Sequence, residues 1–481
     1  MSATIQLALI SHTNNGKTTL ARTLTGVDVG EVRDAAHVTI SSESHALLVT
    51  PQGDELRLWD TPGFGDSVRL LKRLGQSANP IGWFLREVLD RYRDRPFWLS
   101  QQALRAARDA ADIVLYLVNS SEDPQDAGYV PAEMKILEWL GKPVLVLLNQ
   151  TGQPRPLAEE QAEQARWRDH LRQYPVVRDV LALDAFARCW VHERVFYDAL
   201  GKLLNAQQQS GYARLFAEWE AANAQRYHRA MQLLAMQLQT AARDSEAVEA
   251  ESESMLKSAL KVVGIGKNDE QQRQDKAMEK LVARLNRHAV EMTRELLILH
   301  KLDPADAATI NARVRDHFEL RAPIDKAQAG LLGAMISGAA TGLSADLAAG
   351  GLTLGGGALL GGVVGALTFA GAAWGFNSST ERDRATMRFT DAFMRSLVVA
   401  GILRYLAVAH FGRGRGNFVD SEAPAFWQSE VEQVVARHDA ALAALWKDAR
   451  REDTADKVQP LIKQIASATL ERLYPGVAHQ L

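Results

Sequence analysis

A loop near the start of the chain has the residue types and spacing that hold the phosphates of a nucleotide. Residues 11–18 read S-H-T-N-N-G-K-T and match G-x-x-x-x-G-K-[ST] except at the first position, where Ser11 replaces glycine. In such a loop the backbone N–H groups face the phosphates, Lys17 contacts the β and γ oxygens, and Thr18 ligates Mg²⁺. A structural turn is the alternative interpretation of this match taken alone. The predicted nucleotide-binding residues of the loop are Asn14, Asn15, Gly16, Lys17, Thr18 and Thr19.

Two further motifs follow, each at the end of a predicted strand. Residues 60–63 match D-x-x-G, in which Asp60 supports the Mg²⁺ ion and the amide of Gly63 contacts the γ-phosphate. The strand before Asp60 is preceded by residues 46–50 and a turn at 51–54, which together predict a hairpin. A continuous apolar run at 144–148, typical of a buried parallel strand, ends in Asn149 and Gln150. Three motifs in this order make a structural turn a poor explanation of the first one.

With these motifs, residues 1–204 resemble an Era-like P-loop GTPase of the translation-factor superclass. The whole chain resembles a bacterial family that joins such a domain to a helical C-terminal domain of unknown function, here residues 205–481. The resemblance implies an α/β domain with a mostly parallel sheet and helices on both faces, which binds GTP or GDP and hydrolyses GTP. It also implies that Thr18 and a switch threonine, best matched by Thr39, hold Mg²⁺ with support from Asp60. The implied catalytic residues are Lys17, Thr18, Thr39 and Gly63, and Asn149 and Gln150 are the implied base-side residues.

The chain departs from the family pattern at three positions. Phe64 stands where Ras-like proteins place a water-orienting glutamine, which predicts slow hydrolysis until a partner, a dimer or a monovalent cation completes the site. Gly152 replaces the aspartate that pairs with guanine, and losing this contact should cost about 1–3 kcal/mol of base specificity. Asn14 lies where K⁺-activated relatives carry a cation-binding asparagine, and the alternative is a loop residue in a left-handed turn. The fifth family motif has only a weak counterpart at residues 182–185.

Composition is typical of a protein with two or more domains in a reducing compartment. The chain has 481 residues, of which 47% are hydrophobic, and a net charge of −3 that gives no general attraction to nucleic acid. The single cysteine, Cys189, excludes a disulfide framework, and we expect it in the core of an apolar helix at 186–196. The sequence spacing of Cys and His indicates no structural zinc site. The first strand begins almost at Met1, so we expect no signal peptide.

Between Asp60 and the next strand, at 113–118, lies a long connection with predicted helices at 68–74 and 83–92. Its second half is rich in arginine and aromatic residues. It is either an enlarged switch region that docks a partner or an amphipathic surface helix with solvated arginines.

From residue 205 onward the pattern predicts an all-helical domain, because apolar residues recur at intervals of three and four residues. The predicted long helices are 207–257, 269–300 and 380–410, with two more after residue 423. Residues 327–376 hold 14 of the chain's 34 glycines and a single charge, Asp346. Glycines at a spacing of four are typical of closely packed helix pairs. This segment is therefore a soluble helical hairpin, a glycine-zipper hairpin that enters the membrane on a switch, or a flexible loop.

The sequence therefore predicts a GTP-binding protein whose nucleotide state switches a helical domain. One alternative is an Era-like factor for ribosome or RNA assembly, which lacks support because no basic face or strand-bearing RNA module is predicted. The other is a catalytically weak, nucleotide-dependent scaffold. The expected cofactors are Mg²⁺ and, through Asn14, K⁺. The expected partners are a membrane surface or membrane protein and a second copy through the GTPase domain, with nucleic acid unlikely, and the expected location is the cytoplasm, including the inner-membrane surface.

Overall fold

The computed structural model describes residues 2–25, 43–61, 63–64, 67–76, 97–98, 104, 108–151, 155–185, 189–248, 267–302, 374–377, 386–410, 425–452 and 454–475. The chain divides into two compact units. The first comprises residues 1–225 and 409–421, and the second comprises 226–408 and 422–479. The predicted domain boundary at residue 204 stays a prediction, because this division reflects contacts and not the ability of either part to fold alone.

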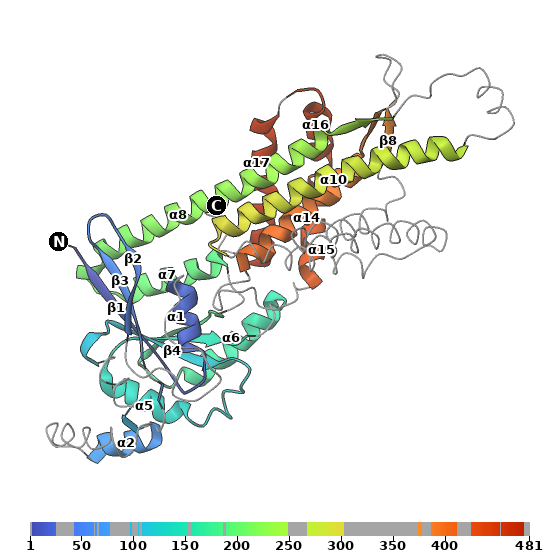
Figure 1. Cartoon of the computed structure of the whole chain (residues 1–481). Helices are drawn as coiled ribbons and strands as arrows, with labels where there is room; N and C mark the ends of the chain where they lie inside the picture. Colours follow the sequence, from blue (N-terminus) through green and yellow to red (C-terminus); the bar gives the residue numbers. More distant parts are fainter. Residues whose placement is uncertain are drawn as a thin grey trace, which may run out of the picture. The chain divides into compact units, whose positions relative to one another are not determined.

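The first unit is built on a six-stranded sheet (Figure 1). The spatial order is β2-β3-β1-β4-β5-β6, and β2 alone runs antiparallel to its neighbour, through the predicted hairpin. The predicted α/β fold with a mostly parallel sheet is therefore confirmed. The strands are β1 (Thr4–Ser11), β2 (Glu43–Val49), β3 (Glu55–Asp60), β4 (Ile113–Asn119), β5 (Val144–Asn149) and β6 (Val177–Ala182).

The central strands are buried on both faces, which is why their sequences are continuous apolar runs. Every residue of β5 and residues 113–118 of β4 are buried. On one face, Tyr116 of β4 packs in a core cluster with Met134 and Trp167 from two of the helices. Fully burying such a side chain contributes about 1.5–3 kcal/mol. The described helices of this part are α1 (Lys17–Thr25), α2 (Ser67–Gln76), α5 (Val130–Leu140), α6 (Leu157–Leu171) and α7 (Trp190–Leu203).

The register of the parallel strands brings their carboxyl ends to one edge of the sheet. Leu9 lies beside Asp60, Ser11 beside Leu117, and Asn119 beside Asn149. The loops that follow β1, β3 and β5 therefore begin at the same edge, where a doubly wound sheet binds its ligand.

The second unit is helical, as predicted, but it also contains a small antiparallel sheet. Its strands β7 (Ser245–Ala247), β8 (Trp374–Asn377) and β9 (Thr386–Phe389) pair in the order β7-β9-β8. The expected helix 207–257 was therefore too long, since α8 (Ala206–Arg243) ends before β7. The expected helix 380–410 begins late, because β9 precedes α14 (Asp391–His410). Local apolar spacing missed this sheet because its three strands are short and come from distant parts of the chain.

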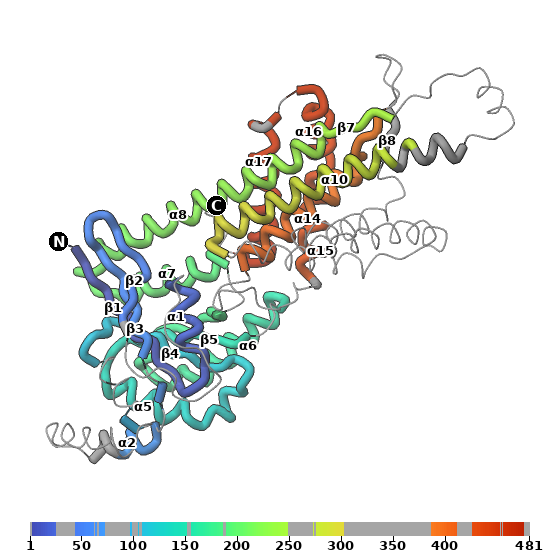
Figure 2. The backbone as a smooth tube through the Cα atoms, in the orientation of Figure 1, coloured from blue at the N-terminus to red at the C-terminus, as the bar shows by residue number. Residues whose placement is uncertain are grey.

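The other helices that the structure describes in this part are α10 (Lys267–Leu299), α15 (Ala425–Arg437), α16 (Asp439–Ala449) and α17 (Ala455–Leu473) (Figure 2). In the described residues after 423 there are thus three helices, where two were predicted. The α8 and α14 helices meet through the rings of Tyr227 and Tyr405, whose centroids are 5.7 Å apart. Within the described ranges, α14 alone has the length and apolar composition of a membrane span, but 78% of its most apolar window is buried in the protein. A helix buried to this extent is equally well explained as a core helix.

Several predictions fall outside the described residues. These are Thr39, Gly152, the helix at 83–92 and residues 327–373 of the glycine-rich segment. The last residues of that segment, 374–376, lie in β8 and not in a helix.

Candidate functional site

The phosphate-binding motif forms a tight turn between β1 and α1. Asn14 and Gly16 have φ angles of 69° and 82°, in the left-handed region. Ser11, at the position where the motif has glycine, is the last residue of β1 and is fully buried. A strand conformation is open to any residue, so the serine fits here without strain. The left-handed turn of Asn14 agrees with its interpretation as a loop residue.

Lys17 is held inside this loop by hydrogen bonds from its ammonium group. Lys17 Nζ donates to Ser11 Oγ at 2.9 Å and to the carbonyl oxygen of His12 at 3.5 Å. Burial lowers the pKa of Lys17, while the carboxylates of Asp60 and Glu133 oppose this shift. A buried ammonium group at the first residue of a helix, here α1, is a strong site for an anion such as phosphate.

The D-x-x-G segment lies against the same loop. Thr18 Oγ1 donates a hydrogen bond to Asp60 Oδ2 at 2.8 Å, so two of the three predicted Mg²⁺ residues are in contact at the sheet edge. A Cβ atom on Gly63 would lie 2.8 Å from Lys17 Nζ, so a side chain at this position would displace the ammonium group of Lys17. The amide of Phe64 donates to the carbonyl oxygen of Ser11 at 3.0 Å. The Phe64 side chain is fully buried in the core cluster, so it does not take the place of a water-orienting glutamine.

The third motif closes the other side of the loop. The amide of Asn149 donates from Nδ2 to the carbonyl oxygen of Asn15 at 2.8 Å and accepts at Oδ1 from the backbone N–H of Ala185 at 2.9 Å. Gln150 Nε2 donates to the carbonyl oxygen of Asn14 at 3.3 Å. Asn149 therefore joins the phosphate loop to residues 182–185, the weak counterpart of the fifth family motif.

A buried carboxylate that the sequence did not single out lies next to this point. Asp184 Oδ2 accepts hydrogen bonds from the backbone N–H of Thr151 at 2.8 Å and from Thr151 Oγ1 at 3.2 Å. It follows β6, immediately before the Ala185 amide that holds Asn149. Asp184 is a carboxylate near the motif in which Gly152, outside the described residues, replaces the family's base-reading aspartate.

A second network missed by the sequence lies behind the phosphate loop. Glu133, fully buried on α5, accepts a hydrogen bond from the Tyr116 hydroxyl at 2.7 Å, and its other oxygen is 2.9 Å from His12 Nδ1. The His12 ring stacks on Tyr129 with 4.2 Å between centroids. Burial raises the pKa of Glu133, and the hydrogen bonds and charges around it partly offset this shift. This network fixes His12 within the loop, and no local spacing could have revealed it.

Taken together, the six-stranded sheet and the loops at its carboxyl edge define the first unit as a P-loop GTPase domain. Residues 6–150 match the family described as 50S ribosome-binding GTPase. Residues 176–470, more than half of the chain, match the family described as Domain of unknown function (DUF3482). The chain belongs to this second family, with a P-loop GTPase domain before the shared region.

Comparison with solved structures gives weaker likenesses. Era of Aquifex aeolicus bound to GDP and aluminium fluoride is 16% identical, with 42% of this chain and 57% of that chain covered and a TM-score of 0.32. Era in complex with MgGDPNP and 16S ribosomal RNA is 16% identical, with 38% and 52% covered and a TM-score of 0.29. A bacterial selenocysteine-specific elongation factor is 16% identical, with 43% and 30% covered and a TM-score of 0.29.

The chain thus spans about half the length of the Era chains that it matches. Scores this low carry no argument, and the expectation that nucleic acid is an unlikely partner gains no support from them. No curated protein matches the chain.

Proposed function

We propose that the chain hydrolyses GTP to GDP and phosphate, and that its nucleotide state controls the helical second unit. The observation that carries the proposal is the convergence of three separate motifs on the phosphate loop. Thr18 and Asp60 are in direct contact, Lys17 lies inside the loop, and Asn149 joins the loop to the segment after β6.

In this proposal each residue has a definite task. Lys17 would stabilise charge on the β and γ phosphates, and Thr18 would be a ligand of Mg²⁺. Asp60 would support the ion, and the Gly63 amide would sense the γ-phosphate. Thr39 is assigned to the metal by the resemblance alone. Mg²⁺ supplies charge stabilisation for the transferring phosphoryl group when it is bound.

Hydrolysis requires a water molecule in line with the γ-phosphate. Phe64 has no polar group and its side chain lies in the core, so it does not orient that water. We therefore propose slow intrinsic turnover that a second copy, a partner or K⁺ at Asn14 accelerates. A protein with turnover too slow to measure would instead be a nucleotide-dependent scaffold.

A direct route for a switch runs from the β2–β3 hairpin to α8. Asp54, in the hairpin turn, is fully buried and accepts hydrogen bonds from Arg214 of α8 at 2.7 Å to both carboxylate oxygens. Residues 206–225 of α8 belong to the first unit, and the same helix continues as part of the second. The β3 strand leads directly from this turn to Asp60 at the site. A movement of β3 on nucleotide exchange would therefore reach α8 through one bidentate ion pair.

The test of the proposal is nucleotide binding and turnover by the full-length protein. We expect GTP to bind more tightly than ATP in calorimetry, and Lys17→Ala to lose measurable binding because it removes the ammonium group of the loop. Lys135→Ala, which removes an exposed lysine from α5, is the matched control and should bind GTP like the wild type. Equal GTP affinity for Lys17→Ala and the wild type would overturn the assignment.

The finer parts of the proposal concern location and partners. We propose a cytoplasmic protein that associates with the inner-membrane surface through residues 327–376. Flotation with liposomes in the GTP and GDP states tests this, and protein that never floats would refute it. An RNA-assembly role is the competing proposal, favoured by the matched family's description as ribosome-binding. Co-sedimentation of the protein with 50S subunits in the GTP state would support that role instead.

A further inference from the structure

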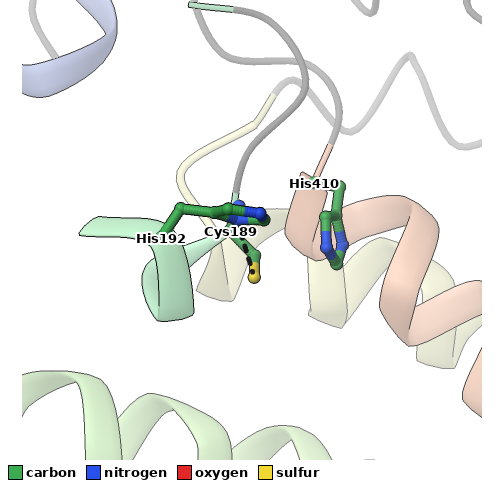
Figure 3. A group of neighbouring side chains, drawn as sticks. All are labelled: Cys189, His192 and His410. Carbon is green, nitrogen blue, oxygen red and sulfur yellow. Dashed lines mark hydrogen bonds between the residues drawn. The ribbon is translucent and has the colours of Figure 1, made fainter. Parts of the chain in front are cut away.

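The single cysteine of the chain lies beside two histidines, and none of the three belongs to the phosphate loop. Cys189 stands immediately before α7, His192 is in the first turn of that helix, and His410 is the last residue of α14 (Figure 3). All three belong to the first unit. Cys189 is fully buried, His410 is 1% exposed, and His192 is half-buried. We propose that these three residues form a zinc-binding site.

The distances fit a single ion. One ligand atom from each of the three side chains lies within 4.8 Å of the other two, and Cys189 Sγ is 3.5 Å from His192 Nδ1. Zinc binds sulfur at about 2.3 Å and imidazole nitrogen at about 2.0–2.1 Å in tetrahedral geometry, which places ligand atoms about 3.5 Å apart. One edge of the tetrahedron is therefore already at this length. The others need at most a contraction of about 1.3 Å, within the reach of small side-chain rotations.

The chemistry of the three groups selects zinc. One thiolate and two imidazoles form a mixed sulfur and nitrogen set, which a borderline-soft ion such as Zn²⁺ prefers and which oxygen-seeking Mg²⁺ avoids. Cys189 also lies at the N-terminus of α7, where the helix dipole favours the negatively charged thiolate that binds metal. Three protein ligands leave a fourth coordination position on the ion.

A hydrogen bond within the cluster offers a second explanation of its geometry, in which His192 serves only to cap α7. The backbone N–H of Cys189 donates to His192 Nδ1 at 3.1 Å, which by itself caps the start of α7. The lone pair on Nδ1 that accepts this bond also faces Cys189 Sγ. An ion bound at Nδ1 replaces the capping bond, so the site and the cap make different predictions when zinc is added. The rings of His192 and His410 lie edge to face with 6.0 Å between centroids, so both imidazoles face one small volume.

Spacing along the chain does not indicate this cluster. Cys189 and His192 are close in the chain, but His410 comes from a helix far along it, and two ligands alone make no recognisable zinc motif. The expectation that Cys189 is buried is confirmed, but its expected place inside an apolar helix at 186–196 is wrong, because α7 begins at Trp190 and Cys189 precedes it. The expectation that the chain has no structural zinc site stays a prediction, which the proposed site opposes.

Cobalt substitution tests the proposal on the untagged full-length protein. After removal of metal with a chelator, Co²⁺ should bind with a stoichiometry of one and produce a thiolate-to-cobalt charge-transfer band. The band is specific to Cys189, because the chain has no second cysteine. Zinc added in equal amount should abolish the band by displacing Co²⁺. Cys189→Ser should lack the band, and His410→Gln should bind Zn²⁺ at least tenfold more weakly in competition with a chromophoric chelator.

The control variant is His300→Gln, which removes a buried histidine from the second unit, and it should keep both the band and the zinc affinity. Circular dichroism shows whether each variant is folded. The proposal is overturned if the wild type gives no charge-transfer band with Co²⁺, or if zinc affinity is the same in the wild type, Cys189→Ser and His410→Gln. The latter result would mean adventitious binding to surface groups. GTP binding is measured on the same samples and should be unchanged in Cys189→Ser, since the cluster contains no residue of the phosphate loop.

Discussion

The phosphate loop depends on the absence of a side chain at one position, and this can be tested by Gly16→Ala. Gly16 has a φ of 82°, and a Cβ added there would lie 2.5 Å from Asn149 Nδ2. Asn149 cannot simply turn away, because its amide group makes two buried hydrogen bonds, to Asn15 at 2.8 Å and from Ala185 at 2.9 Å. The alanine therefore strains the backbone and also displaces the residue that joins the loop to the segment after β6.

The expected cost has two parts. A residue with a side chain in the left-handed region costs about 1–2 kcal/mol. Breaking the hydrogen bonds of a buried amide adds about 1–3 kcal/mol. We therefore expect Gly16→Ala to lower the free energy of unfolding of the first unit by about 2–5 kcal/mol, and to weaken GTP binding because the loop and Asn149 move together.

Gly53→Ala separates the cost of backbone strain from the cost of the lost Asn149 hydrogen bonds. Gly53 has a nearly identical φ of 85°, but its added Cβ would meet only Ser2 Cβ at 3.7 Å, an ordinary contact. This variant should lose only the cost of backbone strain. Hydrogen exchange of the β1 and β5 amides measures the stability of the first unit in the full-length protein. An equal decrease in the free energy of unfolding for the two variants would refute the argument that hydrogen bonds hold Asn149 in place beside Gly16.

Three further predictions follow from other parts of the site. Thr18→Ala should weaken Mg²⁺-dependent GTP binding and turnover several-fold while leaving Mg²⁺-free GDP binding largely intact, as calorimetry with and without the ion would reveal; equal loss in both conditions would contradict a metal role. The hydrogen bonds from Arg214 and from the amide of Ala3 hold the pKa of Asp54 well below its usual value, so this group stabilises the fold above its unfolded pKa of about 3.9 and loses that effect as the pH falls below it. Asp54→Asn should therefore be less stable than the wild type at pH 7, with a difference that shrinks between pH 4 and pH 2 in urea denaturation; a difference that does not change with pH would contradict the ion-pair argument. If Asn14 binds K⁺, GTP turnover in K⁺ should exceed turnover in Na⁺ several-fold, whereas identical rates leave Asn14 as a turn residue.

Local sequence was sufficient for the strands and motifs that form the phosphate site. A strand buried on both faces needs a continuous apolar run, so β1, β4 and β5 could be placed from composition alone. The phosphate loop could be placed because its glycine, lysine and threonine are adjacent in the chain. The convergence of Asp60 and Asn149 on that loop followed from the rule that parallel strands present their carboxyl ends at one edge.

What the tertiary structure decided involves residues far apart in the chain. The sheet of β7, β8 and β9 pairs short segments that show no clear alternation of polar and apolar residues. The helical spacing of the residues around them therefore led to a prediction of helix. The pairing of Asp54 with Arg214 and of His12 with Glu133 depends on how helices pack on the sheet.

The cluster of Cys189, His192 and His410 is the clearest case. Two of its members are one helical turn apart, but the third arrives from the end of α14. Sequence spacing records only distances along the chain, whereas a metal site requires three ligand atoms around one point in space, and only folding brings them there.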